Sequence, residues 1–448
     1  MLPFAVWQLY HTHVRFTFNL TLFNITPAHP VPDSGPAQIS DVAATKLTPT
    51  PMQRPEYRRF WIGLSVASIG FWTHNVAATW LMKDWSNGDP VMIALVQSSI
   101  SLPVMLTALP AGVLADMFDR RRFLIFSQLW MFVLALSVGL AVALGLHNPW
   151  LLILFTAALG FGHAMKMPSQ ASLVPELAGR EHIAAAVSLG SMAINGARII
   201  GPALAGVLLG VVGPRDTFFV AASGFAIYAA LMFSWRRPPQ RPATRGQSLV
   251  DVALGGFRFA ARSRPFRATL IRCFLFFLVW ATVLTVLPNL VADAHIFGQV
   301  YACFGVGGVI GAVSYPFADK RVSRELLLAV GVGIQGVGLF CLAMSRDPII
   351  MGAVLIVIGF ASMYGMISIQ TTAQLMLPEE LRARGMSMIN MTMMGASTIG
   401  APTWGAIAKY RSPEEALIAA AVFSLACLAF TARMKVSGAK QPGGRSPS

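Results

Sequence analysis

The chain has 448 residues, of which 55% are hydrophobic and only 12% are charged, and its formal net charge is +15. A soluble domain carries about a quarter charged residues, so this chain has too few polar side chains to cover two or three soluble domains. Its apolar residues come in blocks of about 20, the length that a helix needs to cross a bilayer. These features exclude a soluble enzyme and predict an integral membrane protein. A nucleic-acid-binding protein is excluded because the basic residues lie in short gaps between the apolar blocks and form no continuous basic face.

The first 58 residues form an extension rich in Pro, Thr and Asn that we predict to be disordered. Its apolar start has no basic n-region and no clean apolar core, so it is a poor signal peptide. Met52 is an alternative start, and the sequence leaves open whether residues 1–51 belong to the mature protein.

Twelve apolar segments then predict twelve transmembrane helices in two bundles of six. The first bundle, over 59–235, has helices expected near 60–83, 92–115, 123–146, 149–170, 183–212 and 216–235. A cytoplasmic linker over 236–266 and a cytoplasmic tail over 435–448 flank the second bundle, over 267–434. Its helices are expected near 267–291, 299–318, 324–345, 349–374, 385–408 and 414–434.

The Lys and Arg residues between these segments are distributed unequally, and basic loops favour the cytoplasmic side. We therefore expect a multi-pass protein of a bacterial-type plasma (inner) membrane with both termini in the cytoplasm. The gaps assigned to the cytoplasm hold Arg120, Arg121, Arg122, Arg180, eight arginines between 236 and 267, Lys320, Arg321, Arg324, Arg382 and Arg384. The other side holds Lys83, Arg215, Arg346, Lys409 and Arg411.

The two predicted bundles share three sequence matches in the same order, at a shift of about 203 residues. LADMFDRR at 114–121 parallels FADKRVSR at 317–324, which aligns Asp116 with Asp319. SLVPEL parallels LMLPEEL at the same shift, and GARIIGP resembles GASTIGAP at a shift shorter by one helical turn. The matches together indicate a duplicated six-helix unit.

The stretch PAGVLADMFDRRRF ends the second predicted helix and begins the third across a very short loop. The arginines are explained by orientation, but Gly112 and Asp116 are not. A glycine permits close helix contact, and a boundary carboxylate is costly unless a cation or a helix N-terminus faces it. Such a contact can form in one conformation and break in another. The predicted gate comprises Gly112, Asp116, Arg120, Arg121 and Asp319.

This stretch resembles the signature loop of the major facilitator superfamily, Gly-x-Leu-Ala-Asp followed by a basic cluster between helices two and three. Met117 and Asp119 depart from the usual arginine and glycine, and the Met117 departure weakens one expected loop contact. The segments DRRR, NGARIIGPALAG and PEELRARG resemble the branch of enterobactin-type siderophore exporters, also called transmembrane secretion effectors. The resemblance covers residues 55–435.

The resemblance implies an all-α fold in which two pseudo-symmetric six-helix bundles enclose a substrate near the membrane midplane. It also implies alternating access by rocking of the bundles. GARIIGPALAG partly resembles the antiporter motif of helix five: Gly201, Pro202 and Gly206 match, whereas Ala197 and Ala205 replace glycines. This motif favours export over import.

Arg198 is a charge in the middle of the fifth predicted helix. An arginine is expensive in the bilayer centre, so its face, shared with Asn195 at i−3, must point into the bundle. Two interpretations stay open: Arg198 binds an anionic substrate group or takes part in gating, or it donates to carbonyls left free around Gly201 and Pro202.

Other polar residues suggest a cavity wall. His163, Lys166 and Gln170 share one face of helix four, and His74 and Asn75 lie in the middle of helix one. We expect Lys166 to extend toward the membrane surface, as long basic side chains do; a substrate role is its alternative. A lone histidine such as His74 is more often a satisfied core residue than a titrating one.

Carboxylates are absent from the middle of the predicted helices. Asp84, at the outer end of helix one, is the first candidate for a proton carrier; an ordinary helix-end charge beside Lys83 is its alternative. Arg272, about one turn into helix seven, is expected to extend toward the membrane surface.

The sequence thus predicts a secondary transporter, an exporter of small organic molecules such as drugs or siderophores, and no enzyme. Because the candidate cavity residues are basic, the expected substrate is anionic or amphipathic. An importer or facilitator for a small anionic solute is the alternative. A polytopic membrane enzyme is a third interpretation, for which the sequence offers no catalytic group of residues.

GVGIQG at 331–336 lies in an apolar segment without a preceding strand, so no nucleotide site is expected. We expect no cofactor, no metal and a monomer; substrate identity and coupling ion stay open.

Overall fold

A computed structural model describes residues 50–107, 119–235, 260–291, 293–377 and 379–434, and these residues form helices and no strands. The long helices are α2 (Pro55–Trp85), α3 (Pro90–Thr107), α5 (Arg120–Ala143), α6 (Pro149–Ala178), α7 (Ile183–Val211), α8 (Gly213–Phe233), α10 (Arg264–Val286), α11 (Ala294–Asp319), α12 (Arg324–Ala343), α13 (Pro348–Met376), α14 (Glu379–Tyr410) and α15 (Pro413–Ala432). Three short 3-10 helices are η1 (Pro51–Gln53), η2 (Arg180–His182) and η3 (Leu287–Leu290). The extension up to residue 49, most of the linker and the tail lie outside the described residues.

Each predicted segment overlaps one of these long helices. Ten helices of the described part are long and apolar enough to cross a membrane; α2 and α14 are not among them. In α2 the polar pair His74 and Asn75 lowers the hydropathy of the segment. The structure therefore gives an all-helical fold with ten candidate spans, and the count of twelve spans stays a prediction.

Local sequence signals explain where the helices begin. Eight of the described helices follow a Ser, Asp or Asn whose side chain accepts a backbone N–H of the first turn, which is the usual N-cap arrangement. These caps are Asp89, Asp119, Asn148, Ser263, Asp293, Ser323, Asp347 and Ser412. Proline in the first turn, as in α2, α6 and α13, fits because its missing N–H would have no helical partner there.

The first helix begins at Pro55, earlier than predicted. Residues 55–58 are therefore part of the helical body and not of a disordered extension. The reason is tertiary: Tyr57 is buried, and its hydroxyl donates to the Ala186 carbonyl of α7 at 2.7 Å. Arg54, just before the helix, forms an ion pair of 2.6 Å with Glu181.

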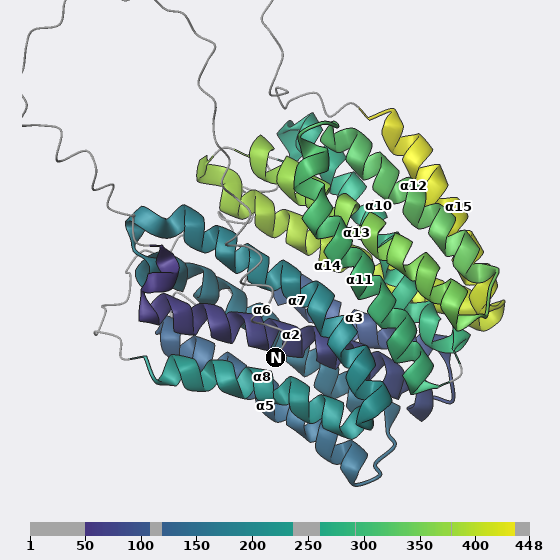
Figure 1. Ribbon diagram of the computed structural model, residues 1–448, viewed down its shortest axis with the longest axis horizontal. Coiled ribbons are helices and arrows are strands. Elements are labelled where there is room, and N and C mark those ends of the chain that lie inside the picture. The colour runs from purple at the N-terminus through teal and green to yellow at the C-terminus, as the bar shows by residue number, and fades with distance from the viewer. Residues whose placement is uncertain (1–49, 108–118, 236–259, 292, 378, 435–448) are drawn as a thin grey trace, which may run out of the picture. The chain divides into compact units, whose positions relative to one another are not determined.

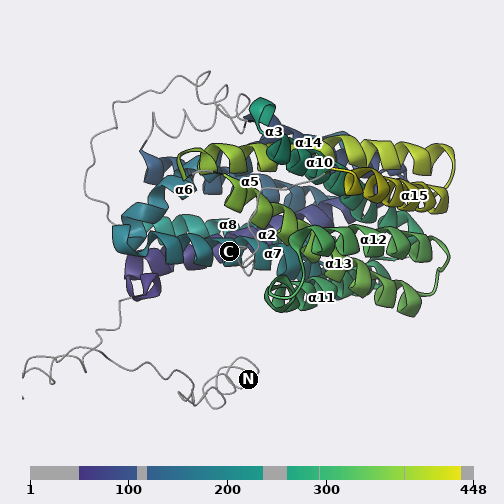
Figure 2. The ribbon, with the colours of Figure 1, turned by 90° about the horizontal axis from the view of Figure 1, so that it is seen from above.

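The helices pack as two groups, a first helix group (α2–α8) and a second helix group (α10–α15), which Figures 1 and 2 show as purple-to-teal and green-to-yellow ribbons. The main contacts between the groups are α3 with α14 and α7 with α11. At the α7–α11 crossing, Gly206 and Gly298 bring the two backbones so close that a Cβ on either glycine would overlap the carbonyl oxygen of the other. Small residues allow such close crossings.

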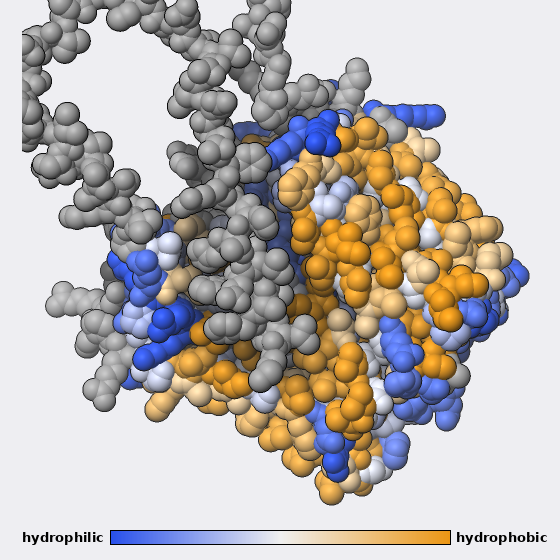
Figure 3. Space-filling model, viewed as in Figure 1, coloured by the Kyte–Doolittle hydropathy of each residue, from blue (hydrophilic) through white to orange (hydrophobic). Residues whose placement is uncertain are grey.

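Most successive helices are joined by short connections and run in opposite directions, so the connections gather at two ends of the assembly. We call the end with the starts of α2, α5, α10 and α12 the basic end, because most of the described arginines lie there. The other end, formed by the connections 86–89, 144–148, 287–291, 344–347 and 411–412, is called the closed end. Between the ends, the face over α11–α13 is largely apolar, with exposed Val309, Val313 and Val337 (Figure 3).

The hydrophobic core differs between the two ends. At the closed end one cluster contains residues of both helix groups, among them Trp80 of α2 and Phe297 of α11, whose rings stack with centroids 4.9 Å apart. Toward the basic end the first helix group has its own cluster around Phe60 and Tyr228. The second helix group has a separate one around Phe276, to which the first group adds only Ile199. The groups are thus joined mainly at the closed end.

Candidate functional site

A central cavity of about 370 Å³ lies between the two helix groups. It is lined by α2, α3, α6 and α7 of the first group and by α10 and α14 of the second. Along α2 its lining runs from Phe60 to Asn75. The remaining turns of α2, from Val76 onward, belong to the closed-end cluster instead. The cavity therefore occupies the half of the assembly nearer the basic end.

Three nitrogen-bearing side chains of the first helix group meet in this cavity: His163 and Lys166 of α6 and Arg198 of α7. Lys166 is only 2% exposed, and its Nζ has no partner among the described residues. The side chains of all three residues line the same cavity. None of the described residues that line the cavity is acidic. The cavity is therefore a cationic site without a carboxylate.

Arg198 contacts both helix groups. Its Nη1 lies 3.1 Å from the Met366 sulfur of α13, and its guanidinium lies 5.7 Å from the Trp72 ring of α2. A thioether is a weak acceptor, so this hydrogen bond leaves Arg198 available for a stronger one. The Gly201 carbonyl accepts from the Thr73 hydroxyl at 3.1 Å. The position of Arg198 in a cavity fits the interpretation that it binds substrate or takes part in gating. The interpretation that it donates to free carbonyls has less support at Gly201, because the Gly201 carbonyl already accepts from Thr73.

Two basic side chains were expected to extend toward the membrane surface, and the expectation for one of them, Lys166, is wrong. Lys166 does not extend to the membrane surface, because it is buried against the cavity. Arg272 has a side chain only 12% exposed, and it donates to the Thr431 and Met434 carbonyls at the end of α15. For Arg272 a neighbouring helix offers a polar site at the basic end that the sequence of α10 itself does not reveal.

Amides mark the boundary between the cavity and the closed end. The Gln97 side chain of α3 donates to the Asn75 Oδ1 at 2.6 Å and to the Thr79 hydroxyl at 3.0 Å. Both Asn75 and Gln97 line the cavity and are nearly fully buried. Sequence reasoning found Asn75 and missed Gln97. The same signal, an amide inside an apolar segment, was present for Gln97 in the second predicted helix.

The second helix group contributes a different surface to the cavity. Its lining residues are Trp280, Asn390, Met393, Met394 and Ser397. Methionine side chains are flexible and polarizable and adapt to varied apolar shapes. Sequence reasoning missed this surface, although five methionines in the nine residues 386–394 were a visible signal.

Three predicted site residues lie outside the cavity lining. His74 is buried, with both ring nitrogens lacking a partner in the described part of the chain, and its ring meets Phe218 edge-on at 5.1 Å. Asn195 is half-buried on α7 beside the lining residues Ser191 and Arg198. Asp84 is exposed at the closed end. The structure places His74 and Asp84 away from the cationic site and Asn195 next to Arg198 but outside the cavity lining, and a transport role for these three residues stays a prediction.

The predicted gate is described only in part, because Gly112 and Asp116 lie outside the described residues. Arg121 donates to the Met232 and Phe233 carbonyls at the end of α8, at 2.9 and 2.7 Å. Arg120 begins α5 and is half-buried. Asp319 faces a cation, as a boundary carboxylate should: it forms two contacts of 2.8 and 2.9 Å with Arg324. This pair lies within the second helix group.

The glycines of the helix-five motif act in packing. Gly201 lies against Trp72 and Thr73 of α2, and Gly206 lies against Gly298 of α11. Pro202 is buried inside α7. In the described residues no group of three His, Cys, Asp or Glu side chains could hold a metal ion.

An all-helical assembly with ten candidate spans and an internal cavity between two helix groups is typical of a multi-pass membrane transporter for a small molecule. The family model described as transmembrane secretion effector matches residues 46–443. The chain therefore belongs to this family of major facilitator transporters, and it is not an enzyme.

Sequence relatives agree with this family. The chain is 25% identical to the MFS-type transporter YfiS of Bacillus subtilis, over 77% of this chain and 85% of that one. It is 24% identical to the staphyloferrin A transporter of Staphylococcus aureus and 25% identical to the multidrug efflux pump Tap of Mycolicibacterium fortuitum. Each of these two matches covers 72% of this chain and 82% of the relative.

Solved structures share the fold at low identity. The nucleoside transporter NupG matches with a TM-score of 0.69 and 13% identity, over 85% of this chain and 98% of that one. A bacterial homologue of the human lysosomal transporter Spinster, in an inward-facing and occupied conformation, matches with a TM-score of 0.69 and 12% identity. That match covers 88% of this chain and 100% of the other. At these identities the likeness concerns the fold alone.

Proposed function

We propose that the chain exports small anionic, amphipathic molecules through the central cavity. The observation that carries this proposal is that Lys166 and Arg198 both line a cavity whose described lining has no acidic residue. A buried cation without a counter-charge is costly, and an anionic substrate group would supply the missing partner. Hydrogen bonds to charged groups contribute about 1.5–3 kcal/mol each, enough to select anions over cations.

The second surface of the cavity suits the apolar part of such a substrate. Met393, Met394 and Trp280 lie across the cavity from the cationic residues, on the other helix group. Flexible methionines accept apolar groups of different shapes. The substrate would therefore bridge the two helix groups, with its anionic end on the first and its apolar body on the second.

The transport cycle we propose is alternating access by two six-helix bundles, over 59–235 and 267–434, with twelve membrane spans in all. The described state would be the one open toward the basic end, because the shared hydrophobic cluster joins the groups at the closed end and their cores are separate near the basic end. The positive-inside rule places the basic end in the cytoplasm, in a plasma (inner) membrane, with both termini inside. In this state substrate would enter from the cytoplasm.

The direction of transport is inferred from relatives and from α7. The family description speaks of secretion, and one relative is an efflux pump. Gly201, Pro202 and Gly206 also fit the helix-five motif of antiporters. Proton coupling and a monomeric state belong to the same proposal. Asp84 is the candidate proton carrier, and it lies outside the cavity lining.

Transport in everted membrane vesicles tests substrate class and direction together. We expect energised everted vesicles to accumulate an anionic amphipathic dye and to discriminate against a lipophilic cation of similar size. Lys166→Gln and Arg198→Gln should each weaken dye uptake, whereas Arg215→Gln, at an exposed closed-end residue paired with Asp216, should not. A preference for the cation would overturn the anionic substrate. Accumulation only in right-side-out vesicles would overturn export in favour of import.

A further inference from the structure

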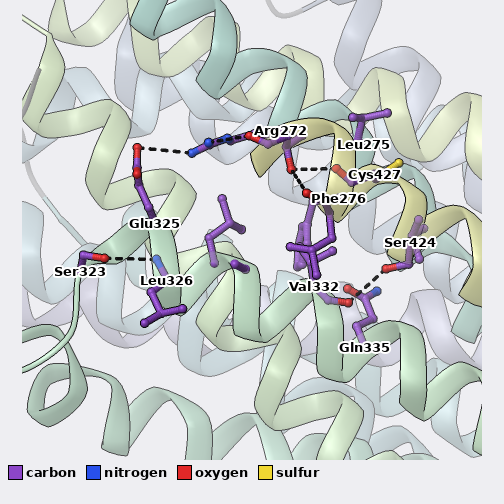
Figure 4. A pocket seen from close by; sticks show the side chains of 15 residues that line it. Arg272, Leu275, Phe276, Ser323, Glu325, Leu326, Val332, Gln335, Ser424 and Cys427 are labelled. Atoms are coloured by element: carbon purple, nitrogen blue, oxygen red, sulfur yellow. Dashed lines mark hydrogen bonds and ion pairs between the residues drawn. The ribbon is translucent and has the colours of Figure 1, made fainter. Parts of the chain in front are cut away.

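A second cavity, of about 300 Å³, lies inside the second helix group among α10, α12 and α15 (Figure 4). It shares no lining residue with the central cavity. The transport cycle proposed above does not use it.

The mouth of this second cavity carries one positive and one negative side chain. Arg272 of α10 and Glu325 of α12 face each other, with Nη1 and Oε1 3.8 Å apart (Figure 4). Arg272 is held in place by the Thr431 and Met434 carbonyls, and its Nε has no partner among the described residues. Glu325 lies in the first turn of α12, whose N-terminal N–H groups favour a phosphate. The mouth thus offers separate sites for an anion and a cation.

Below the mouth the cavity is narrow and mainly apolar. Phe276, Leu328 and Val332 line it, and Gln335 lies at its inner end (Figure 4). Ten residues of α12 separate Glu325 from Gln335, which corresponds to a depth of about 15 Å. A volume of about 300 Å³ over this depth gives a cross-section of roughly 20 Å². That section suits a single extended hydrocarbon chain.

The inner end of the cavity also offers a hydrogen-bond donor. Gln335 is 1% exposed, and its Nε2 has no partner in the described part of the chain. A buried donor without a partner costs about 1–3 kcal/mol. A double bond of an unsaturated acyl chain is a weak acceptor for this N–H and would reduce part of the cost.

An apolar groove runs along the outer side of α12, between α13 and α15. It shares Leu326, Ala329 and Leu428 with the enclosed cavity, so the two depressions meet just below Arg272 and Glu325. Val330 and Val337 of the groove are exposed on the apolar face of the helix group. Two hydrocarbon chains that diverge from one headgroup would fit this geometry.

We propose that the second helix group binds a membrane phospholipid whose headgroup carries an ammonium group, such as phosphatidylethanolamine. The phosphate lies on Arg272 and the α12 N-terminus, and the ammonium lies on Glu325. One acyl chain enters the enclosed cavity and the other follows the outer groove. The site is at the basic end, where pockets between membrane helices meet lipid headgroups.

Lipid binding to the purified full chain tests this proposal. Native mass spectrometry should show tighter retention of phosphatidylethanolamine than of phosphatidylglycerol, which lacks the ammonium, and of phosphatidylcholine, whose ammonium has no N–H. We expect a preference of about 5-fold or more. Glu325→Gln should abolish the preference over phosphatidylglycerol, whereas Glu415→Gln, an exposed glutamate at the closed end, should keep it.

A second variant separates the cavity from the headgroup site. Ala329→Phe, at a residue shared by the enclosed cavity and the groove, should lower retention of all three lipids several-fold. Ala353→Phe, at an exposed alanine of α13 outside both depressions, is its matched control and should leave retention unchanged. Equal retention of the three lipids by the wild type, or a Glu325→Gln variant that keeps the preference, would overturn the proposal. Dye transport by the variants is independent of these outcomes and reports on the proposed export.

Discussion

The closed end and the basic end of the same helices differ in what joins the two helix groups. At the closed end the groups share one hydrophobic cluster, and Gly206 and Gly298 bring α7 and α11 into backbone contact. Toward the basic end the groups have separate cores, and the cavity between them holds Lys166 and Arg198. Close packing therefore holds the groups together, while the cations are left for a ligand. Under the proposed function, the closed-end packing would set the conformational state and the cavity charges would select the substrate.

The largest effect is expected from a bulky residue in the closed-end packing. Gly298→Leu should force α7 and α11 apart, because even a Cβ at this position would overlap the Gly206 carbonyl oxygen. Overpacking typically costs about 1–3 kcal/mol, which would shift the equilibrium between states by roughly 5- to 150-fold. We expect dye transport to fall by more than about 10-fold and cysteine probes in the closed-end connections to become more reactive.

A matched control for this variant is Gly333→Leu. Gly333 lies on α12, where the nearest atom to an added Cβ is the end of the Leu428 side chain at 3.6 Å. It should leave transport nearly unchanged. Equal losses in both variants would mean that the Gly206–Gly298 crossing has no special part in holding the closed end.

The next effect concerns the cations of the cavity. Lys166→Gln and Arg198→Gln each remove one charge, and a hydrogen bond to a charged group contributes about 1.5–3 kcal/mol. We expect the KM for an anionic substrate to rise about 10-fold or more in each variant, and the double variant to lose saturable uptake. Uptake assays over a range of dye concentrations measure this. An unchanged KM in both single variants would show that the anion binds elsewhere.

A smaller effect is expected at the boundary between the two regions. Gln97→Leu removes the donor to Asn75 and Thr79. Loss of a buried hydrogen-bond partner costs about 1–3 kcal/mol, so the melting temperature of the detergent-solubilised protein should fall by a few degrees. Gln299→Leu, at an exposed residue of α11, serves as control. A Gln97→Leu protein as stable as the wild type would show that the amide contacts contribute little.

The smallest effect is expected from the ion pair between Lys409 and Asp89, which joins the helix groups across the closed end at 2.7 Å. Both side chains are partly exposed, and such pairs contribute about 1 kcal/mol or less. Burial raises the pKa of the Asp89 carboxyl, but hydrogen bonds from Lys409 and from backbone N–H groups outweigh burial and hold this pKa below its usual range.

Because the pKa is lowered in the folded protein, the stabilisation by this pair is complete above the ordinary aspartate pKa of about 3.9 and is lost as the pH falls through the lowered value. Asp89→Asn should therefore change probe accessibility at the closed end by less than about 5-fold at neutral pH, and the difference from wild type should disappear in strong acid. A difference that grows on acidification would contradict this assignment.

The positions of the helices and the membrane class could be predicted from the sequence because their signals are local. Apolar blocks, N-cap residues such as Asp119 and Asn148, and first-turn prolines act within a few residues of each helix. The cost of a charge in hydrocarbon likewise required Arg198 to face the interior. The start of α2 was misplaced because Tyr57 is buried by a contact with α7, far away in the sequence.

Which polar residues share a site was decided only by the tertiary structure. His74 and His163 are both single histidines in apolar helices, yet His74 packs against Phe218 and His163 lines the cavity. Lys166 and Arg272 looked alike in sequence, yet one enters the central cavity and the other binds the end of α15. The rotation of each helix about its axis depends on the side chains of its neighbours, and no segment contains that information by itself. Composition therefore determined that the chain lies in a membrane, and packing between distant helices determined where its charges meet.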